Sequence, residues 1–149
     1  MSQNRPTQID ARGPRFGATV TTIVLAAIFV LQGSAAATAL LVIQAIVFGL
    51  GALIGVHAQP YGVFFAKVIR PRLAPATNFE APEPPRFAQF VGLLFVVAAL
   101  VGIALDAPLL TQIAVGFALA AAFLNAAFAF CLGCEMYLII KRITTASTH

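Results

Sequence analysis

Residues 34–56 read SAAATALLVIQAIVFGLGALIGV, an apolar run that contains no charged side chain. A helix needs about 20 apolar residues to cross the hydrocarbon of a bilayer, and this run is long enough to do so. Three further stretches are comparably apolar, at 16–32, 87–105 and 109–140. They are continuous, whereas the strands of a membrane barrel alternate in polarity over about ten residues. The sequence therefore predicts an all-α protein, a four-helix transmembrane bundle.

The composition also indicates that the protein lies in a lipid bilayer. Of the 149 residues, 60% are hydrophobic and only 9% are charged. A soluble domain of this size cannot bury so much apolar surface. We therefore expect residues 16–143 to form one membrane domain, between an N-terminal tail at 1–15 and a C-terminal tail at 144–149.

The first apolar run has an alternative interpretation as a cleaved signal peptide. Arg12 and Arg15 precede the run, and small residues follow it, as at a cleavage site. However, the apolar character resumes immediately after Gly33-Ser34. This continuity favours a tight turn between two antiparallel helices.

The basic residues fall on one side of a four-span arrangement. The chain has nine Lys and Arg residues and a net charge of +4. They are Arg5, Arg12, Arg15, Lys67, Arg70, Arg72, Arg86, Lys141 and Arg142. Because positive residues stay in the cytoplasm, both termini are predicted to be cytoplasmic. The charge thus indicates orientation and contact with lipid headgroups, and no nucleic-acid partner is expected.

The connection at 57–86 is the longest polar segment, and we expect it to be a cytoplasmic loop. Pro60 can start a short helix, and Tyr61–Arg70 combines apolar bulk with basic residues, as in a helix that lies in the headgroup layer. Pro71 is expected to end this interfacial helix, and later prolines favour an extended return to the membrane. The loop is the largest cytoplasmic surface for a partner.

A short repeat links the two halves of the chain. Pro14-Arg15-Phe16 opens the first predicted helix and Pro85-Arg86-Phe87 opens the third. Such a triplet suits a helix start at the membrane surface, where Arg reaches the headgroups. It also fits a duplicated hairpin with halves related by an axis along the membrane normal. Within the spans, Gln44 and Asn125 are expected to form hydrogen bonds between helices.

Both cysteines lie at the end of the last apolar run, in the sequence FCLGCE at 130–135. On a continuous helix over 109–140, the side chains of Cys131, Cys134 and Glu135 share one face, which Phe117, Leu124 and Phe128 continue inward. Residues at positions i and i+3 can bring their sulfur atoms within reach of a disulfide. We expect only modest nucleophilicity, because the pair would lie near the C-terminal end of a helix and Glu135 opposes thiolate formation.

Three functions fit this candidate site. The first is a cytoplasm-facing thiol–disulfide or sulfur relay, for which Cys131, Cys134 and Glu135 are the candidate catalytic residues. One cysteine would act as nucleophile and the other would resolve the intermediate. The second is a soft-metal site formed by Cys131, Cys134 and Glu135 with His57, although a lone Cys-x-x-Cys lacks the second pair of a structural zinc site. The third is a non-catalytic membrane subunit that recruits a partner and whose cysteines only pack.

No cofactor is predicted beyond the disulfide-forming dithiol itself. A quinone-linked thiol oxidase ranks lower than the relay. Those enzymes handle disulfides on the oxidising side of the membrane, whereas the basic residues assign this pair to the reducing cytoplasm.

Several stretches together resemble a bacterial membrane family, the domain of unknown function 4395. These stretches are Asp10–Phe16, Val68–Leu73, Pro85–Gln89, and Phe130–Glu135 with Tyr137. The resemblance spans Asp10 to Ile143 and implies a small multi-pass protein of the bacterial inner membrane, with Cys-Leu-Gly-Cys-Glu as the family's hallmark. It further implies a thioredoxin-like or sulfurtransferase partner, and hence a thiol role for Cys131 and Cys134.

Overall fold

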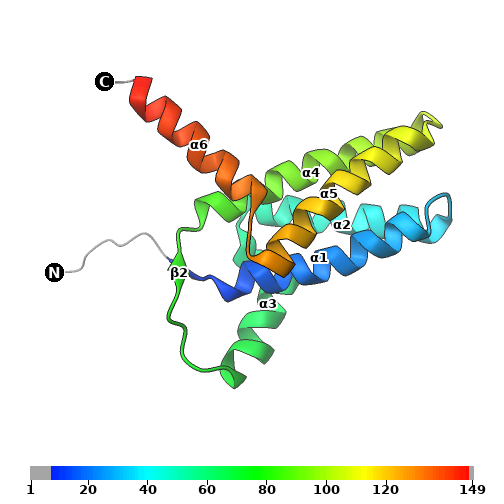
Figure 1. Cartoon of the computed structure of the whole chain (residues 1–149). Coiled ribbons are helices and arrows are strands. Elements are labelled where there is room, and N and C mark those ends of the chain that lie inside the picture. Colours follow the sequence, from blue (N-terminus) through cyan, green and yellow to red (C-terminus); the bar gives the residue numbers. More distant parts are fainter. Residues whose placement is uncertain (1–7, 148–149) are drawn as a thin grey trace.

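The computed structural model describes residues 8–147. Arg5 and the outer parts of both predicted tails lie outside the described residues. The prediction of an all-α protein with four apolar spans is confirmed. The four membrane-length helices are α1 (Arg12–Val30), α2 (Ala35–Leu53), α4 (Glu83–Ala104) and α5 (Pro108–Phe128). They run antiparallel along one axis, with the α1–α2 and α4–α5 turns at the same end (Figure 1).

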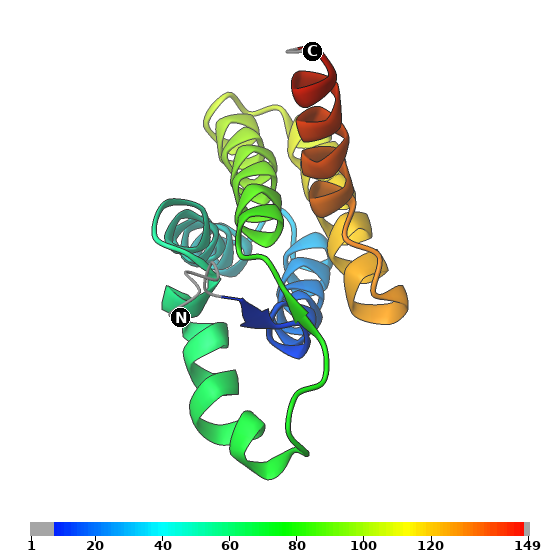
Figure 2. The ribbon, with the colours of Figure 1, turned by 90° about the vertical axis from the view of Figure 1, so that its left-hand side faces the viewer.

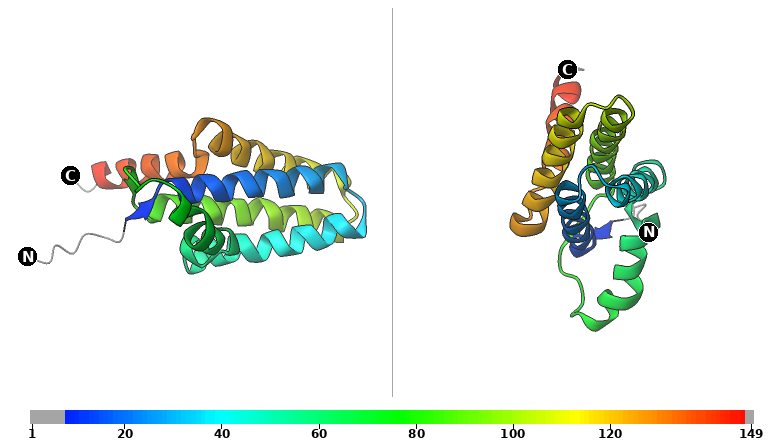
Figure 3. Two further views of the ribbon diagram at one scale, coloured as in Figure 1. Left: turned by 90° about the horizontal axis from the view of Figure 1, so that it is seen from below. Right: turned by 90° about the vertical axis from the view of Figure 1, so that its right-hand side faces the viewer.

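The four helices form a ring in which each helix packs between two neighbours. Helix α1 lies against α2 and α5, and α4 also lies against α2 and α5 (Figure 3). The core is apolar and includes Leu25, Leu41 and Val96, all nearly inaccessible. Large side chains on the outside are exposed, such as Val30 at 81% and Leu53 at 74%. An apolar outer surface is what a bundle in lipid requires.

The first turn agrees with the tight turn predicted at Gly33-Ser34. Gly33 has a φ of +91°, a conformation that side chains disfavour. The Ser34 hydroxyl accepts a hydrogen bond from the Ala37 N–H at 3.2 Å and so caps the start of α2. These two residues therefore reverse the chain within a few positions.

At the other end of the bundle, the central connection is tied to the start of α1 (Figure 2). Strand β1 (Ile9–Asp10) pairs antiparallel with β2 (Phe79–Glu80). Asp10 forms an ion pair with Arg12 at 2.9 Å and a longer one with Arg70 at 3.8 Å. The middle of the connection, at Arg70, and its later part, at β2, thus both contact the segment just before α1.

The central connection contains more helix than expected. After η1 (Val56–Ala58), helix α3 (Pro60–Phe64) continues through η2 (Phe65–Ile69) and η3 (Arg70–Arg72). Pro60 starts this segment as predicted, but Pro71 lies inside its last turn. Helix α4 also begins earlier than the predicted 87–105, because prolines are tolerated in a first turn, where N–H groups have no helical partner.

The single helix predicted over 109–140 is wrong. Helix α5 ends at Phe128, and α6 (Leu132–Ser147) runs in a different direction, away from the bundle (Figure 1). Ala129 adopts the left-handed conformation, with φ at 54° and ψ at 29°. Helix α6 also continues through 144–147, which were expected to belong to the tail.

The two repeated Pro-Arg-Phe triplets have matching roles. Arg15 donates hydrogen bonds to the carbonyls of Ala126 and Ala127 at the end of α5, at 3.2 and 3.5 Å. Arg86 donates to the last carbonyls of α2, at 2.7 and 2.6 Å. Each guanidinium therefore caps a helix of the other hairpin and is favoured by the negative end of that helix. The two hairpins thus cap each other in the same way.

Candidate functional site

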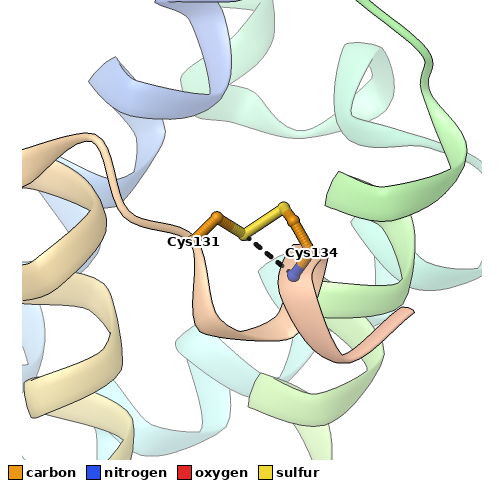
Figure 4. The surroundings of a disulfide bond; sticks show 2 residues. All are labelled: Cys131 and Cys134. Atoms are coloured by element: carbon orange, nitrogen blue, oxygen red, sulfur yellow. Dashed lines mark hydrogen bonds between the residues drawn. A yellow bond between two sulfur atoms is a disulfide. The ribbon is translucent and has the colours of Figure 1, made fainter. Parts of the chain in front are cut away.

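The two cysteines form a disulfide at the start of α6 (Figure 4). Cys131 directly precedes the helix, and Cys134 lies in its first turn. Their Cα atoms are 5.2 Å apart, within the range of protein disulfides. The expectation that this spacing permits a disulfide agrees with the structure. Both residues are partly exposed.

Cys131 occupies the position that caps the N-terminus of α6. The Cys134 N–H donates a hydrogen bond to the Cys131 sulfur at 3.2 Å, and the Cys131 carbonyl accepts one from the Glu135 N–H at 3.0 Å. Free N–H groups and the helix dipole make an N-terminus favourable for a negative charge. The expected place near a helix C-terminus is therefore wrong, because the chain breaks at Ala129. The N-terminus of α6 favours a thiolate at Cys131.

Glu135 is exposed in the first turn of α6, where an acidic side chain suits the helix dipole. Over residues 8–147, no hydrogen bond or ion pair joins its carboxyl group to either cysteine. Glu135 therefore contacts Cys131 through its backbone N–H, and its carboxyl group takes no part in this contact.

Gly133, between the two cysteines, allows the short disulfide loop to lie directly on α4. A Cβ atom at this position would be 2.6 Å from both the Cα and the Cβ of Ala88. One turn further on, the Tyr137 ring packs against Phe87, with centroids 5.8 Å apart. The cysteine spacing is evident in the sequence, but this contact with α4 is not. The glycine between the cysteines was its only signal.

A cavity of about 230 Å³ lies beside Cys131, among α1, α2, α4, α5 and the start of α6. Its lining is mainly apolar and includes Phe48, Phe95, Phe117, Ala118, Ala121 and Met136. Three uncharged polar residues also line it, Thr21, Gln89 and Asn125. Among the described lining residues, Cys131 is present and Cys134 is not. Of the apolar strip expected below the cysteines, only Phe117 lines this cavity.

The cavity could not be predicted from the sequence, because its lining residues come from segments that are far apart in the chain.

Gln44 and Asn125 were predicted to form hydrogen bonds between helices. The Gln44 carbonyl oxygen accepts a hydrogen bond from the Tyr61 hydroxyl at 3.0 Å. The Asn125 side chain, in contrast, has no hydrogen-bond partner within the described part of the chain.

His57 belongs to a different cavity, of about 170 Å³, whose lining includes Asp10, Gln59 and Arg70. Among residues 8–147, no three His, Cys, Asp or Glu side chains are close enough to hold a metal ion. The soft-metal set of Cys131, Cys134, Glu135 and His57 is therefore not assembled, and the two sulfur atoms bond to each other instead.

Two carboxyl groups near this end have shifted affinities for protons. The hydrogen bond from Arg12 lowers the pKa of Asp10 below its ordinary value. Partial burial raises the pKa of Glu80, which pairs with Ile9 in the short ladder. The two pKa shifts have opposite signs. Protonation of Asp10 therefore weakens the fold, whereas protonation of Glu80 favours it.

These features define a multi-pass helical membrane protein with a cysteine pair at the N-terminus of a helix that leaves the bundle. The chain belongs to the family described as a domain of unknown function, DUF4395, whose model matches residues 9–142. No curated protein and no solved structure matches the chain.

Proposed function

We propose that this protein exchanges electrons with a soluble, thioredoxin-like dithiol partner through Cys131 and Cys134. The observation that carries the proposal is the hydrogen bond from the Cys134 N–H to the Cys131 sulfur at the start of α6. A thiolate at Cys131 accepts this bond and gains from the helix dipole, so it is a good leaving group in disulfide exchange.

The exchange proceeds in two balanced steps. A partner thiolate attacks the sulfur of Cys134, the Cys131–Cys134 bond breaks, and Cys131 leaves as the thiolate. The second partner thiolate then attacks the partner's own sulfur in the mixed disulfide and releases Cys134. The partner becomes a disulfide, and the pair takes up its two electrons; the same steps run in reverse when the pair is the reductant.

The size of the disulfide loop supports a redox role. In the chain-entropy estimate, a cross-link that closes only about four residues contributes about 2 kcal/mol, much less than a long loop gives. The sequence separation here is three residues. A bond of this kind ties no distant elements together, so stabilisation of the fold is a weak reason for it.

We further propose that the pair faces the cytoplasm of a bacterial inner membrane and that both termini are cytoplasmic. In support, Arg15 and Arg86 open α1 and α4 at the end of the bundle where α6 begins, and positive residues remain on the cytoplasmic side. Disulfides in a reducing compartment are usually transient and catalytic.

The segment from α3 to η3 is proposed to lie in the headgroup layer. It leaves the bundle sideways (Figure 1), exposes Phe64 and Val68, and ends with Arg70 and Arg72. Apolar side chains among basic ones are the composition of an interfacial helix.

Thiol labelling in vesicles tests the proposal. In inverted vesicles, a membrane-impermeant maleimide should label Cys131 and Cys134 after reduction and neither residue after reoxidation. Cys134→Ser should retain labelling of Cys131 in both conditions. With Cys131→Ser, the Cys134 thiolate should attack the disulfide of an oxidised soluble partner and release one partner thiol. It should stay bonded to the other partner sulfur as a mixed disulfide, because Cys131 is no longer there to displace the partner. Mass spectrometry of the trapped site distinguishes this product from the persulfide that a sulfurtransferase would leave.

Two results would contradict the proposal. Labelling confined to right-side-out vesicles would place the pair on the other face. Equal labelling with and without reductant, together with normal function of the double Cys→Ser variant, would favour the non-catalytic subunit whose cysteines pack.

A further inference from the structure

We infer that the cavity beside Cys131 binds a membrane quinone, which accepts the two electrons of the reduced cysteine pair. This inference rests on the proposed exchange function and names the second reaction partner. A quinone-linked oxidase ranked lower because the basic residues assign the cysteine pair to the reducing cytoplasm. A quinone dissolves in the bilayer, so a site within the bundle can receive it whichever side supplies the dithiol.

The cavity suits an apolar ring with a tail. Its volume of about 230 Å³ exceeds the roughly 150 Å³ of an apolar protein cavity that admits benzene. Phe48 and Phe95 contribute aromatic walls. Phe117 also lines the cavity, although 61% of it is exposed. The cavity therefore reaches the outer, lipid-facing surface of the bundle, where an isoprenoid tail can leave it.

The polar groups of the lining suit the carbonyl oxygens of a quinone. Gln89 uses its carbonyl oxygen to accept a hydrogen bond from Gln59 at 2.6 Å, which leaves its N–H groups to donate. The side chains of Thr21 and Asn125 have no hydrogen-bond partner among residues 8–147, and Thr21 is only 6% exposed. Uncharged donors in an apolar cavity orient a ligand and stabilise the negative charge that its oxygens gain on reduction.

The reaction balances with the groups present. The Cys131 thiolate adds to the quinone ring and forms a sulfur–carbon bond. The Cys134 sulfur then attacks Cys131, the sulfur–carbon bond breaks, and its electron pair passes to the ring. Two thiols and one quinone thus give one disulfide and one quinol, with both protons supplied by the thiols. Of the two cysteines, only Cys131 lines the cavity. Cys131 is therefore the one that bonds to the ring, and Cys134 is the one that attacks Cys131 afterwards.

The test uses the full chain in detergent and a short-chain ubiquinone analogue without oxygen. Protein reduced by a dithiol and then freed of it should convert one quinone to quinol for each disulfide that re-forms. Cys134→Ser should give a charge-transfer absorption band with the quinone, and Cys131→Ser should give none. The band reports contact between thiolate and ring without any turnover.

A matched pair of substitutions on α5 tests the position of the site. Ala121 lines the cavity, and its neighbour Ala120 is exposed outside it. Ala121→Phe should slow quinone reduction by at least about tenfold, since small changes in pocket volume have effects of this size. Ala120→Phe should leave the rate unchanged, and both variants should exchange normally with a soluble dithiol.

The outcomes separate the two proposals. Normal dithiol exchange without quinone reduction, or equal rates in the two alanine variants, would overturn the quinone site and leave the exchange function intact. Failure of dithiol exchange would overturn the proposed function. In that case, photo-crosslinking by an azido-quinone in the double Cys→Ala protein decides the cavity: competed labelling of α4 or α5 supports binding, and uncompeted labelling contradicts it.

Discussion

Replacement of Gly133 by alanine should loosen the disulfide from α4. The added Cβ would meet the Cα and Cβ of Ala88 at 2.6 Å. Because Ala88 belongs to a helix backbone that cannot rotate aside, we expect an overpacking cost of about 1–3 kcal/mol. Alanine recovers at most about 1 kcal/mol of helix propensity. The contact between α6 and α4 should therefore weaken by about 1–2 kcal/mol.

This change should be visible as reactivity. A loss of about 1.4 kcal/mol raises the undocked population roughly tenfold. A bulky phosphine that reaches the disulfide mainly in that population should then reduce Gly133→Ala up to about tenfold faster than the natural chain. The measurement is the reduction rate in detergent, followed by alkylation of the released thiols, with thermal unfolding recorded in parallel.

Gly49 provides the matched control. It lies within α2, and a Cβ there would meet no atom within 4 Å. Gly49→Ala should raise stability by roughly 0.5–1 kcal/mol and leave the reduction rate unchanged. If Gly133→Ala proves as stable and as slowly reduced as Gly49→Ala, the contact with Ala88 does not hold the disulfide in place.

Four further substitutions test the rest of the structure. Arg15→Ala should speed disulfide reduction and cost about 1 kcal/mol of stability, whereas Arg86→Ala should cost a similar amount in unfolding scans but leave the reduction rate unaffected. Because the pKa of Asp10 is lowered, its ion pair with Arg12 stabilises the fold above the ordinary carboxyl pKa, and this stabilisation is lost as pH falls through the folded value. Asp10→Asn should therefore lower the melting temperature at neutral pH and flatten the acid unfolding curve. The pKa of Glu80 is raised, so its ionisation opposes folding as pH rises through the ordinary value to the raised one; Glu80→Gln should stabilise the protein at pH 7, and an unchanged melting temperature would refute this.

The paired arginines also show how the two ends of the bundle's hairpins differ. Arg15 and Arg86 occupy the same place in the two triplets, and each caps the closing helix of the opposite hairpin. After these capped ends, one chain segment turns into η1 at Val56 and the other into the disulfide loop at Cys131. The segments that follow the two capped helix ends are thus different, and of the two only the one after α5 contains cysteines.

The apolar runs alone determined the class of protein. A stretch such as 34–56 must find an apolar solvent and satisfy its own backbone, which a spanning helix does without help from the rest of the chain. The turn at Gly33-Ser34 and the reach between Cys131 and Cys134 are also local. They follow from the conformational freedom of glycine, from capping by serine and from the spacing of residues along a helix, all of which can be read from the sequence.

Tertiary structure decided where the last helix ends and what the cysteines face. Residues 124–132 contain no Gly or Pro, so local propensity continues the helix through them. The break at Ala129 is held by Arg15, which is 111 residues away from Ala126 in sequence, and by the contact of Gly133 with Ala88. The same contacts bring Cys131 to the N-terminus of α6 and to a cavity built from several helices. These interactions arise only after the bundle has assembled. For this reason the sequence predicts one continuous helix with the cysteines near its C-terminus, whereas the structure has them at the N-terminus of α6.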